Sequence, residues 1–167
     1  MARLGQLQDQ YEQAANYYML AIPLAARYHP AYLATVYNKY GSLLSSLPES
    51  AVNIPRGMYY LDKAEQIARQ HDALKIITCV LCNQAKLYRN LRRYKESLDL
   101  SLRGLELAQQ NHFAQWELVL LNNIGDLYFS MGNFKEAIPF LEQSLKIKGS
   151  GIDPYYRNMA VFTLGEV

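Results

Sequence analysis

The sequence predicts an all-α protein, an α-solenoid in which antiparallel helical hairpins stack one on the next. Three observations carry this prediction. A pattern of small and aromatic residues recurs at intervals of roughly 40 residues along the 167-residue chain. Apolar residues between these positions return every three or four residues, which is the spacing of one face of a helix. Short segments with Gly or Asn separate the helical stretches and suit tight turns.

The first predicted element is a partial repeat at residues 1–29. Residues 1–8 have the pattern of the end of a first helix, and a second helix follows from Asp9. Three complete hairpins are expected at about 30–71, 72–112 and 113–150. A last partial repeat at 151–167 is a first helix alone, with Asp153 and Pro154 as its start signal. We expect a single domain over 1–167 that breaks mid-repeat at both ends, and therefore a piece of a longer array or an array that stacks end to end.

The hairpins are justified by three columns of small residues. These columns are Ala14, Gly57, Ser97 and Ala137; Ala21, Ala64, Gly104 and Ser144; and Ala2, Gly41, Ala85, Gly125 and Gly165. A bulky apolar residue precedes the first column by three positions, as Phe134 precedes Ala137. Two antiparallel helices approach closely only where a small side chain lies at their crossing. The columns therefore predict where the helices of each hairpin cross.

The hairpin at about 30–71 differs from the other hairpins in its turn. The interval from Gly41 to Gly57 is four residues longer than the corresponding intervals, because of the segment SSLPESAVNIPR. We interpret this insertion at 45–56 as a longer surface turn, with a dedicated ligand contact as the alternative.

The pattern resembles the tetratricopeptide repeat. The residues that carry the resemblance are Gly125, Tyr128, Gly132, Phe134 and Ala137, with their counterparts in the other repeats. The resemblance implies a right-handed superhelix and a non-enzymatic protein-interaction function. The proline that usually closes the second helix is missing and the period exceeds the usual one of about 34 residues. Both departures favour a long-period subclass of about 40 residues, found in sensor and adaptor proteins.

Composition excludes several classes of protein. Seventeen Lys and Arg against fifteen Asp and Glu leave a net charge of +2, which is not the strongly basic surface of a nucleic-acid binder. No apolar run approaches the roughly 20 residues of a membrane-spanning helix. The first residues lack the apolar core of a secretory signal, although a signal would be missing from a fragment. We therefore expect a cytoplasmic protein with no nucleic-acid partner and no membrane insertion.

The cysteines, the histidines and the basic segment at 88–95 are better explained by structural roles than by catalysis or ligand binding. Cys79 and Cys82 form a CxxC in the middle of a predicted helix, without two further zinc ligands. His29, His71 and His112 fall at turns between repeats, too far apart for one metal ion. The basic segment at 88–95 contains tyrosines that occupy packing columns, so they are not available to stack on bases. We expect no enzyme activity, no cofactor and no metal site.

The candidate binding surface is the concave face, which first helices line in a stacked-hairpin solenoid. Its predicted peptide-binding residues are Asn38, Lys39, Cys82, Asn83, Lys86, Arg89, Asn122, Asn123, Asp126 and Phe129. Asn83 and Asn123 share one repeat position, and an Asn side chain can pair with an extended peptide backbone. The cations Lys39, Lys86 and Arg89 favour an acidic peptide or a C-terminal carboxylate.

Two functional hypotheses follow. In the first, the chain binds a peptide or helix of a partner protein in its concave groove. In the second, it is a sensory or regulatory segment of a larger signalling or transcription-regulating protein, and it acts through a change of curvature or through homodimerisation by exposed array ends. Accessible polar residues in the groove favour the first hypothesis, whereas apolar exposed ends favour the second.

Overall fold

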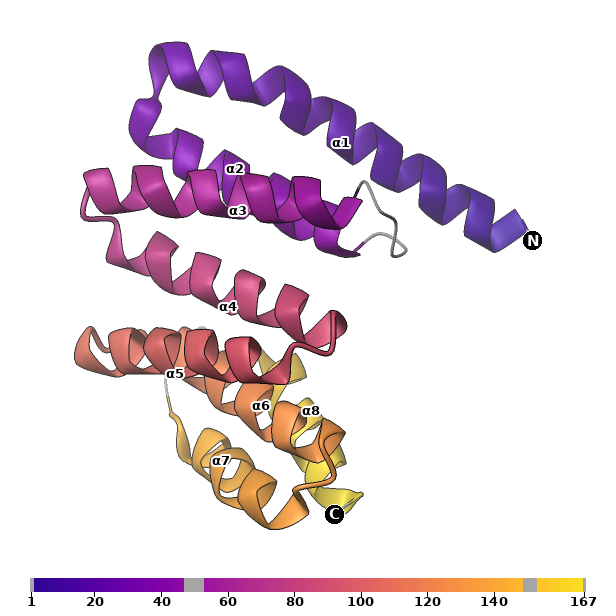
Figure 1. Ribbon diagram of the computed structural model, residues 1–167, viewed down its shortest axis with the longest axis vertical. Coiled ribbons are helices and arrows are strands. Elements are labelled where there is room, and N and C mark those ends of the chain that lie inside the picture. The colour runs from indigo at the N-terminus through magenta and orange to yellow at the C-terminus, as the bar shows by residue number, and fades with distance from the viewer. Residues whose placement is uncertain (1, 47–52, 149–152, 167) are drawn as a thin grey trace. The chain divides into compact units, whose positions relative to one another are not determined.

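The computed structural model describes residues 2–46, 53–148 and 153–166, with side chains from Gln10 onward. These residues form eight α-helices and contain no β-strand (Figure 1). The helices are α1 (Ala2–Tyr28), α2 (Pro30–Ser46), α3 (Asn53–Gln70), α4 (Leu74–Asn90), α5 (Tyr94–Gln110), α6 (Ala114–Ser130), α7 (Phe134–Lys146) and α8 (Pro154–Gly165). The all-α prediction is confirmed, and residues 47–52 of the predicted insertion at 45–56 lie outside the described residues.

The turns between α3 and α7 set the period of the repeat. Asp72, Arg92, His112 and Gly132 have positive φ angles of 48°, 57°, 56° and 76°. These residues follow one another at intervals of 20 positions, and α4, α5 and α6 each contain 17 residues. One helix with its turn therefore takes 20 residues, and the two helices of a hairpin give the period of 40 residues seen in the sequence. Gly132 was predicted at a turn because Gly adopts positive φ without strain, whereas the other three turns place a non-glycine residue there.

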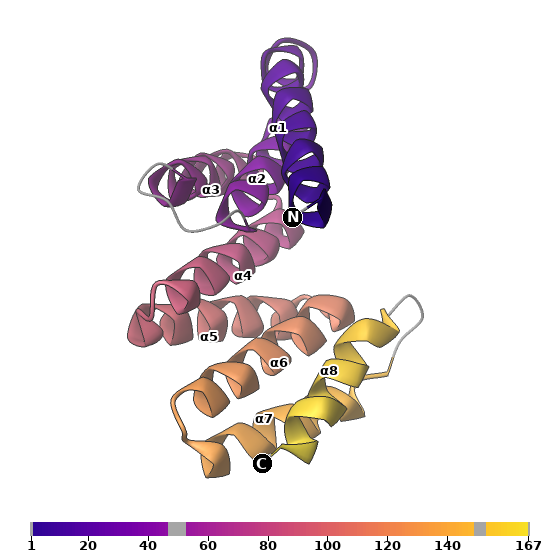
Figure 2. The ribbon, with the colours of Figure 1, turned by 90° about the vertical axis from the view of Figure 1, so that its right-hand side faces the viewer.

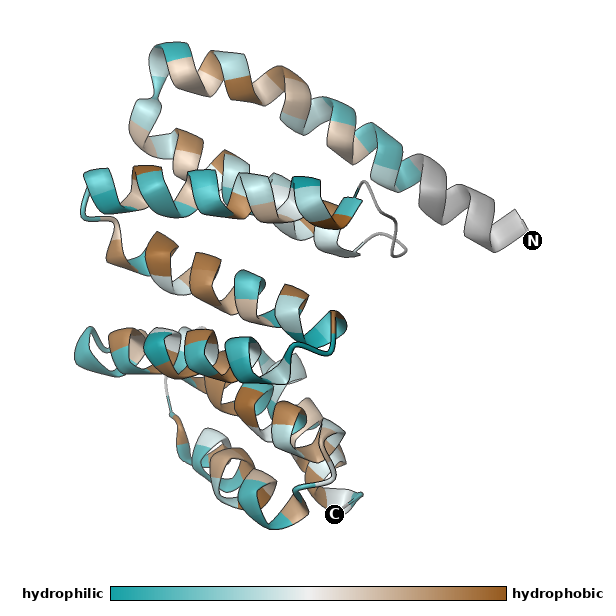
Figure 3. Cartoon of the chain, viewed as in Figure 1, coloured by the Kyte–Doolittle hydropathy of each residue, from teal (hydrophilic) through white to brown (hydrophobic). Residues whose placement is uncertain are grey.

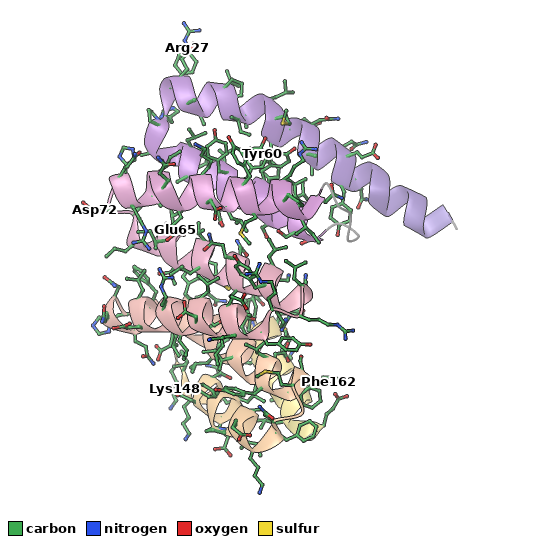
Figure 4. All side chains as sticks on the ribbon, viewed as in Figure 1. Arg27, Tyr60, Glu65, Asp72, Lys148 and Phe162 are labelled. Atoms are coloured by element: carbon green, nitrogen blue, oxygen red, sulfur yellow. The ribbon has the colours of Figure 1, made fainter. Side chains whose placement is uncertain are left out.

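The chain forms two compact units, residues 1–83 and 84–167, and the boundary falls within α4. In the first unit, α1 packs against α2, and α2 packs against α3. The core between α1 and α2 contains Ala25, Leu33 and Val36, with Tyr18 and Ile22 packed against them. The ring of Tyr40 contacts those of Tyr18 and Tyr60, with centroids 5.9 and 4.6 Å away, and Figure 4 labels Tyr60 on α3.

Helix α1 differs from the sequence prediction. It runs without interruption from Ala2 to Tyr28, whereas the sequence placed a turn between two helices near Asp9. The turns of the other hairpins need a residue with positive φ, which strains most residue types. An uninterrupted α1 keeps its backbone hydrogen bonds without that strain.

Glycines mark the crossing of α2 and α3, as the small-residue columns predict. A Cβ atom added to Gly41 would lie 2.8 Å from Leu61 Cγ and 2.9 Å from the carbonyl oxygen of Gly57. A Cβ atom added to Gly57 would lie 2.8 Å from Ser45 Oγ. The two backbones therefore approach at a distance that leaves no room for a larger side chain at either position.

The second unit shows the alternation of a solenoid. α6 packs against α5 and α7, and α8 packs against both α7 and α6 (Figure 2). The α6–α7 crossing lies at Gly125, where an added Cβ would be 2.6 Å from Leu141 Cγ. Because α6 has neighbours on several sides, eight of its 17 residues are buried, and it is more hydrophobic than α5 in Figure 3. The predicted hairpin architecture is thus present in this unit.

The start of α8 follows its sequence signal. The carboxylate of Asp153 accepts a hydrogen bond from the backbone N–H of Tyr155 at 2.9 Å, with Pro154 at the first helical position. This arrangement satisfies a donor that the helix itself leaves unpaired.

Candidate interaction surface

In the first unit, polar side chains predicted to bind a peptide bind one another instead. Asn38 on α2 donates a hydrogen bond from Nδ2 to Cys79 Sγ on α4 at 3.0 Å. Asn83, one turn further along α4, donates to Asn38 Oδ1 at 2.9 Å. Each of these contacts joins a first helix to the first helix of the next repeat. Asn38 and Asn83 therefore link two layers of the repeat.

Burial also decides the chemistry of the CxxC pair. Burial raises the pKa of the Cys79 thiol, against smaller opposite effects of the Asn38 hydrogen bond and the charge of Lys39. A protonated thiol is a poor nucleophile, since the thiolate is the reactive form. Cys82 is buried and its thiol is not in a disulfide. The geometry agrees with the structural interpretation of CVLC rather than with a redox motif.

In the second unit, the cation and the carboxylate predicted to contact a peptide form an ion pair. Arg89 Nη1 on α4 lies 2.8 Å from Asp126 Oδ2 on α6, and both side chains are about a quarter exposed. The other oxygen of Asp126 accepts a hydrogen bond from Thr163 Oγ1 on α8 at 3.3 Å. Asp126 thereby connects three successive first helices of this unit.

Asn122 is buried between α6 and α8. Its Nδ2 donates to the backbone carbonyl of Tyr156 at 2.6 Å, and only 2% of the residue is exposed. Its Oδ1 atom has no hydrogen-bond partner among the described residues. Asn122 holds α8 in place and presents no surface to a ligand.

Three predicted contact residues therefore need correction. Asn38, Cys82 and Asn122 are buried, so their side chains are not on an accessible face. Helical periodicity placed them opposite the hairpin interface, but each first helix also contacts the first helix of the next layer. That second contact buries residues of the first helix that lie between the hairpin interface and the exposed face.

The remaining predicted residues keep some accessibility. Lys39 and Lys86 are exposed, and Asn83, Arg89, Asn123 and Asp126 are half-buried. Phe129 is half-buried as well, packs against the core of Ala137, Leu141 and Ala160, and contacts Phe134 edge-on at 5.3 Å. The accessible part of the candidate surface in the second unit is thus the strip that contains Lys86, Arg89, Asn123 and Asp126.

The pairing of these residues across layers was not predicted from the sequence. A signal was present, because Arg89 and Asp126 have opposite charges and their separation of 37 residues is one repeat less about one helical turn, on the same predicted face. The exposure of apolar residues on α1 and α8, which include Tyr17, Leu20, Val161 and Phe162, was not predicted either.

Among the residues whose side chains are described, no three His, Cys, Asp or Glu side chains are grouped so that they could hold a metal ion. None of the helices in the described ranges has both the length and the apolar character needed to cross a membrane.

Comparisons with known proteins agree with this fold. A model of the family described as "Tetratricopeptide repeat" matches residues 76–150. The structure is similar to that of BtubC (BKLC) from P. vanneervenii, with a TM-score of 0.75 and 22% sequence identity, over 99% of this chain and 68% of that chain. At this identity the likeness concerns the fold alone. A search of curated proteins returned no match. Residues 76–150 of this chain are therefore similar to tetratricopeptide repeats, and the chain as described has an all-α helical-repeat fold.

Proposed function

We propose that the chain is a non-enzymatic interaction module that binds an acidic segment of a partner protein on the first-helix face of its second unit. Tetratricopeptide repeats generally mediate protein–protein interaction, which supports the general class of function. The proposed surface consists of Lys86, Arg89, Asn123 and Asp126. It lies on the part of α4 after Asn83 and on α6.

One observation supports the preference for an acidic segment. Lys86 is exposed one turn before Arg89, so the two cations lie on the same side of α4. Asp126 balances only one of these two charges. The guanidinium of Arg89 has five N–H donors, and its hydrogen bond to Asp126 uses one of them. A carboxylate of a partner can therefore approach Lys86 and share Arg89 with Asp126.

The proposal is tested with an array of acidic, neutral and basic peptides that carry free C-termini. We expect retention of acidic peptides, and the variant Lys86→Glu should weaken it about fivefold to tenfold through the reversed charge. Lys135→Glu, the same change at an exposed position of α7, is the matched control and should leave retention unchanged. Failure to retain any peptide, or equal loss in both variants, would contradict the proposal.

A second candidate function is a regulatory segment that acts by association. The observation that favours it is the large apolar exposure of α1 and α8. This function uses surfaces other than the Lys86 strip, so the charge variants above do not affect it.

A further inference from the structure

Asp126 places a negative charge inside the Lys86 strip. Nη1 of Arg89 on α4 donates a hydrogen bond to Asp126 Oδ2 at 2.8 Å, and Thr163 Oγ1 on α8 donates to the other oxygen, Oδ1, at 3.3 Å. The side chains of Arg89 and Asp126 are 25% and 27% exposed, so solvent reaches both groups of the pair. Arg89 therefore already contacts a carboxylate of its own chain, at the site where an acidic partner would need it.

Two neighbouring helices hold the Asp126 carboxylate in this position. Thr163 is only 7% exposed, and α8 packs against α6. One turn before Asp126 on α6, Nδ2 of Asn122 donates to the backbone carbonyl of Tyr156 on α8, which is a second hydrogen bond between the same two helices. Because its two oxygens accept from different helices, the carboxylate has less freedom to turn away from Arg89 than a fully exposed aspartate has.

The guanidinium of Arg89 decides what the acidic group of a partner would meet. The hydrogen bond to Asp126 uses one of its five N–H donors, so a second carboxylate can still bind. Two carboxylates on one guanidinium lie roughly 4–6 Å apart, and like charges at this separation repel each other. Asp126 also offsets one of the two positive charges of the strip. Both effects weaken the attraction of the strip for an acidic segment.

We propose that Asp126 is an internal competitor of the partner's acidic group: it occupies Arg89 in the unbound chain and lowers the affinity of the Lys86 strip for acidic segments. This inference rests on the proposed function and adds the residue that limits the affinity. The same contact links α4 to α6, so a partner that draws Arg89 toward itself loosens this link. Binding at the strip and the side-chain link between the two helices therefore oppose each other.

The test is a fluorescence anisotropy titration with labelled hexaglutamate, and with hexaglutamine as the neutral probe. Asp126→Asn removes the charge but keeps the size of the side chain and an oxygen that can accept from Thr163. This variant should bind hexaglutamate about fivefold to tenfold more tightly than the unmodified chain does, with unchanged binding of hexaglutamine. A substitution that only damaged the fold would weaken binding instead. Circular dichroism should show unchanged helical content.

Two control variants separate competition for Arg89 from a general loss of negative charge. Asp99→Asn makes the same charge change in another ion pair, that of Asp99 with Arg103 on α5, and should leave the affinity within about twofold. Arg89→Gln removes the cation for which the two acids compete. In that background, Asp126→Asn should change the affinity by less than about twofold.

The outcomes distinguish this inference from the proposed function. If the unmodified chain binds hexaglutamate and Asp126→Asn binds it no more tightly, the inference is wrong and the proposed function stands. An equal gain in Asp99→Asn, or the full gain in the Arg89→Gln background, would also overturn the inference. Binding that occurs only in Asp126→Asn would support the inference and contradict the proposed function of the unmodified chain. No binding by either protein would overturn both.

Discussion

At the scale of single residues, the column of small residues divides into positions that fix a crossing and one that does not. Gly41 and Gly125 lie where a second helix passes too close for a Cβ atom. Gly165 occupies the same position of the repeat but has open space around it. The same residue type at the same repeat position therefore has different energetic roles, which its neighbours decide.

Substitution of the two glycines should separate these roles. Gly125→Ala should lower the free energy of unfolding by about 1–3 kcal/mol, because Leu141 must shift to admit the methyl group. Gly165→Ala should be neutral or stabilising by up to about 1 kcal/mol, since Ala favours the helix and meets no neighbour. Urea denaturation at a concentration low enough to keep the chain monomeric measures both. Equal destabilisation by the two changes would show that the open face of α8 is covered.

At the scale of elements, polar side chains link successive first helices inside each unit. Asn38 and Asn83 link α2 to α4, and Arg89 and Asp126 link α4 to α6. The residues that meet are 37 to 45 positions apart in the chain, which is one repeat give or take one helical turn. These links supply a side-chain contact between layers in addition to apolar packing.

A double-mutant cycle on Arg89 and Asp126 should reveal this contribution. We expect a coupling free energy of about 0.5–1.5 kcal/mol from Arg89→Ala, Asp126→Ala and the double variant, because the pair is only about a quarter exposed. The matched control is Arg103 and Asp99 on α5, which are half or more exposed and 3.7 Å apart, and whose coupling should be near zero. Thermal or urea unfolding supplies the four free energies of each cycle. Indistinguishable couplings in the two cycles would mean that Arg89 and Asp126 do not link the layers.

At the scale of the whole molecule, three acidic groups among the described residues of the first unit are harder to ionise than usual. Burial raises the pKa of Cys79 from its ordinary value of 9.0. Burial likewise raises the pKa values of Tyr37 and Tyr40 from 10.0, although the charge of Arg56 partly opposes the effect at Tyr40. The unfolded chain therefore loses these protons at lower pH than the folded chain does. Their contribution to stability is complete below about pH 9 and decreases as the pH rises through 9 and 10.

Alkaline pH should accordingly destabilise the first unit. We expect the midpoint of thermal unfolding to decrease by a few degrees, on the order of 2–4 °C, between pH 8.5 and pH 10.5. The variant Cys79→Ala combined with Tyr40→Phe removes two of the three groups and should flatten this dependence, even if it lowers stability at pH 7. Scans of both proteins across the pH series test the expectation. An unchanged slope in the variant would assign the alkaline effect to other groups.

The sequence by itself determined the helical hairpins, their period and their crossing points. These features depend on local spacing that recurs in each repeat, such as the column that contains Gly41 and Gly125, the column that contains Gly57 and Ala137, and the turn at Gly132. Helical periodicity also placed Arg89, Asn122 and Asp126 on the face opposite the hairpin interface. It could not say whether their partners belong to a ligand or to the next layer.

Only the tertiary structure decided the partners of that face. Asn38, Cys82 and Asn122 are buried, and Arg89 pairs with Asp126, because first helices stack on one another at a separation of one repeat. It also decided that α1 continues through the turn predicted near Asp9 and that α1 and α8 expose apolar stripes. A pattern read along one chain reports which positions share a helix face. The burial of that face depends on which neighbour covers it, and this is a property of the folded arrangement.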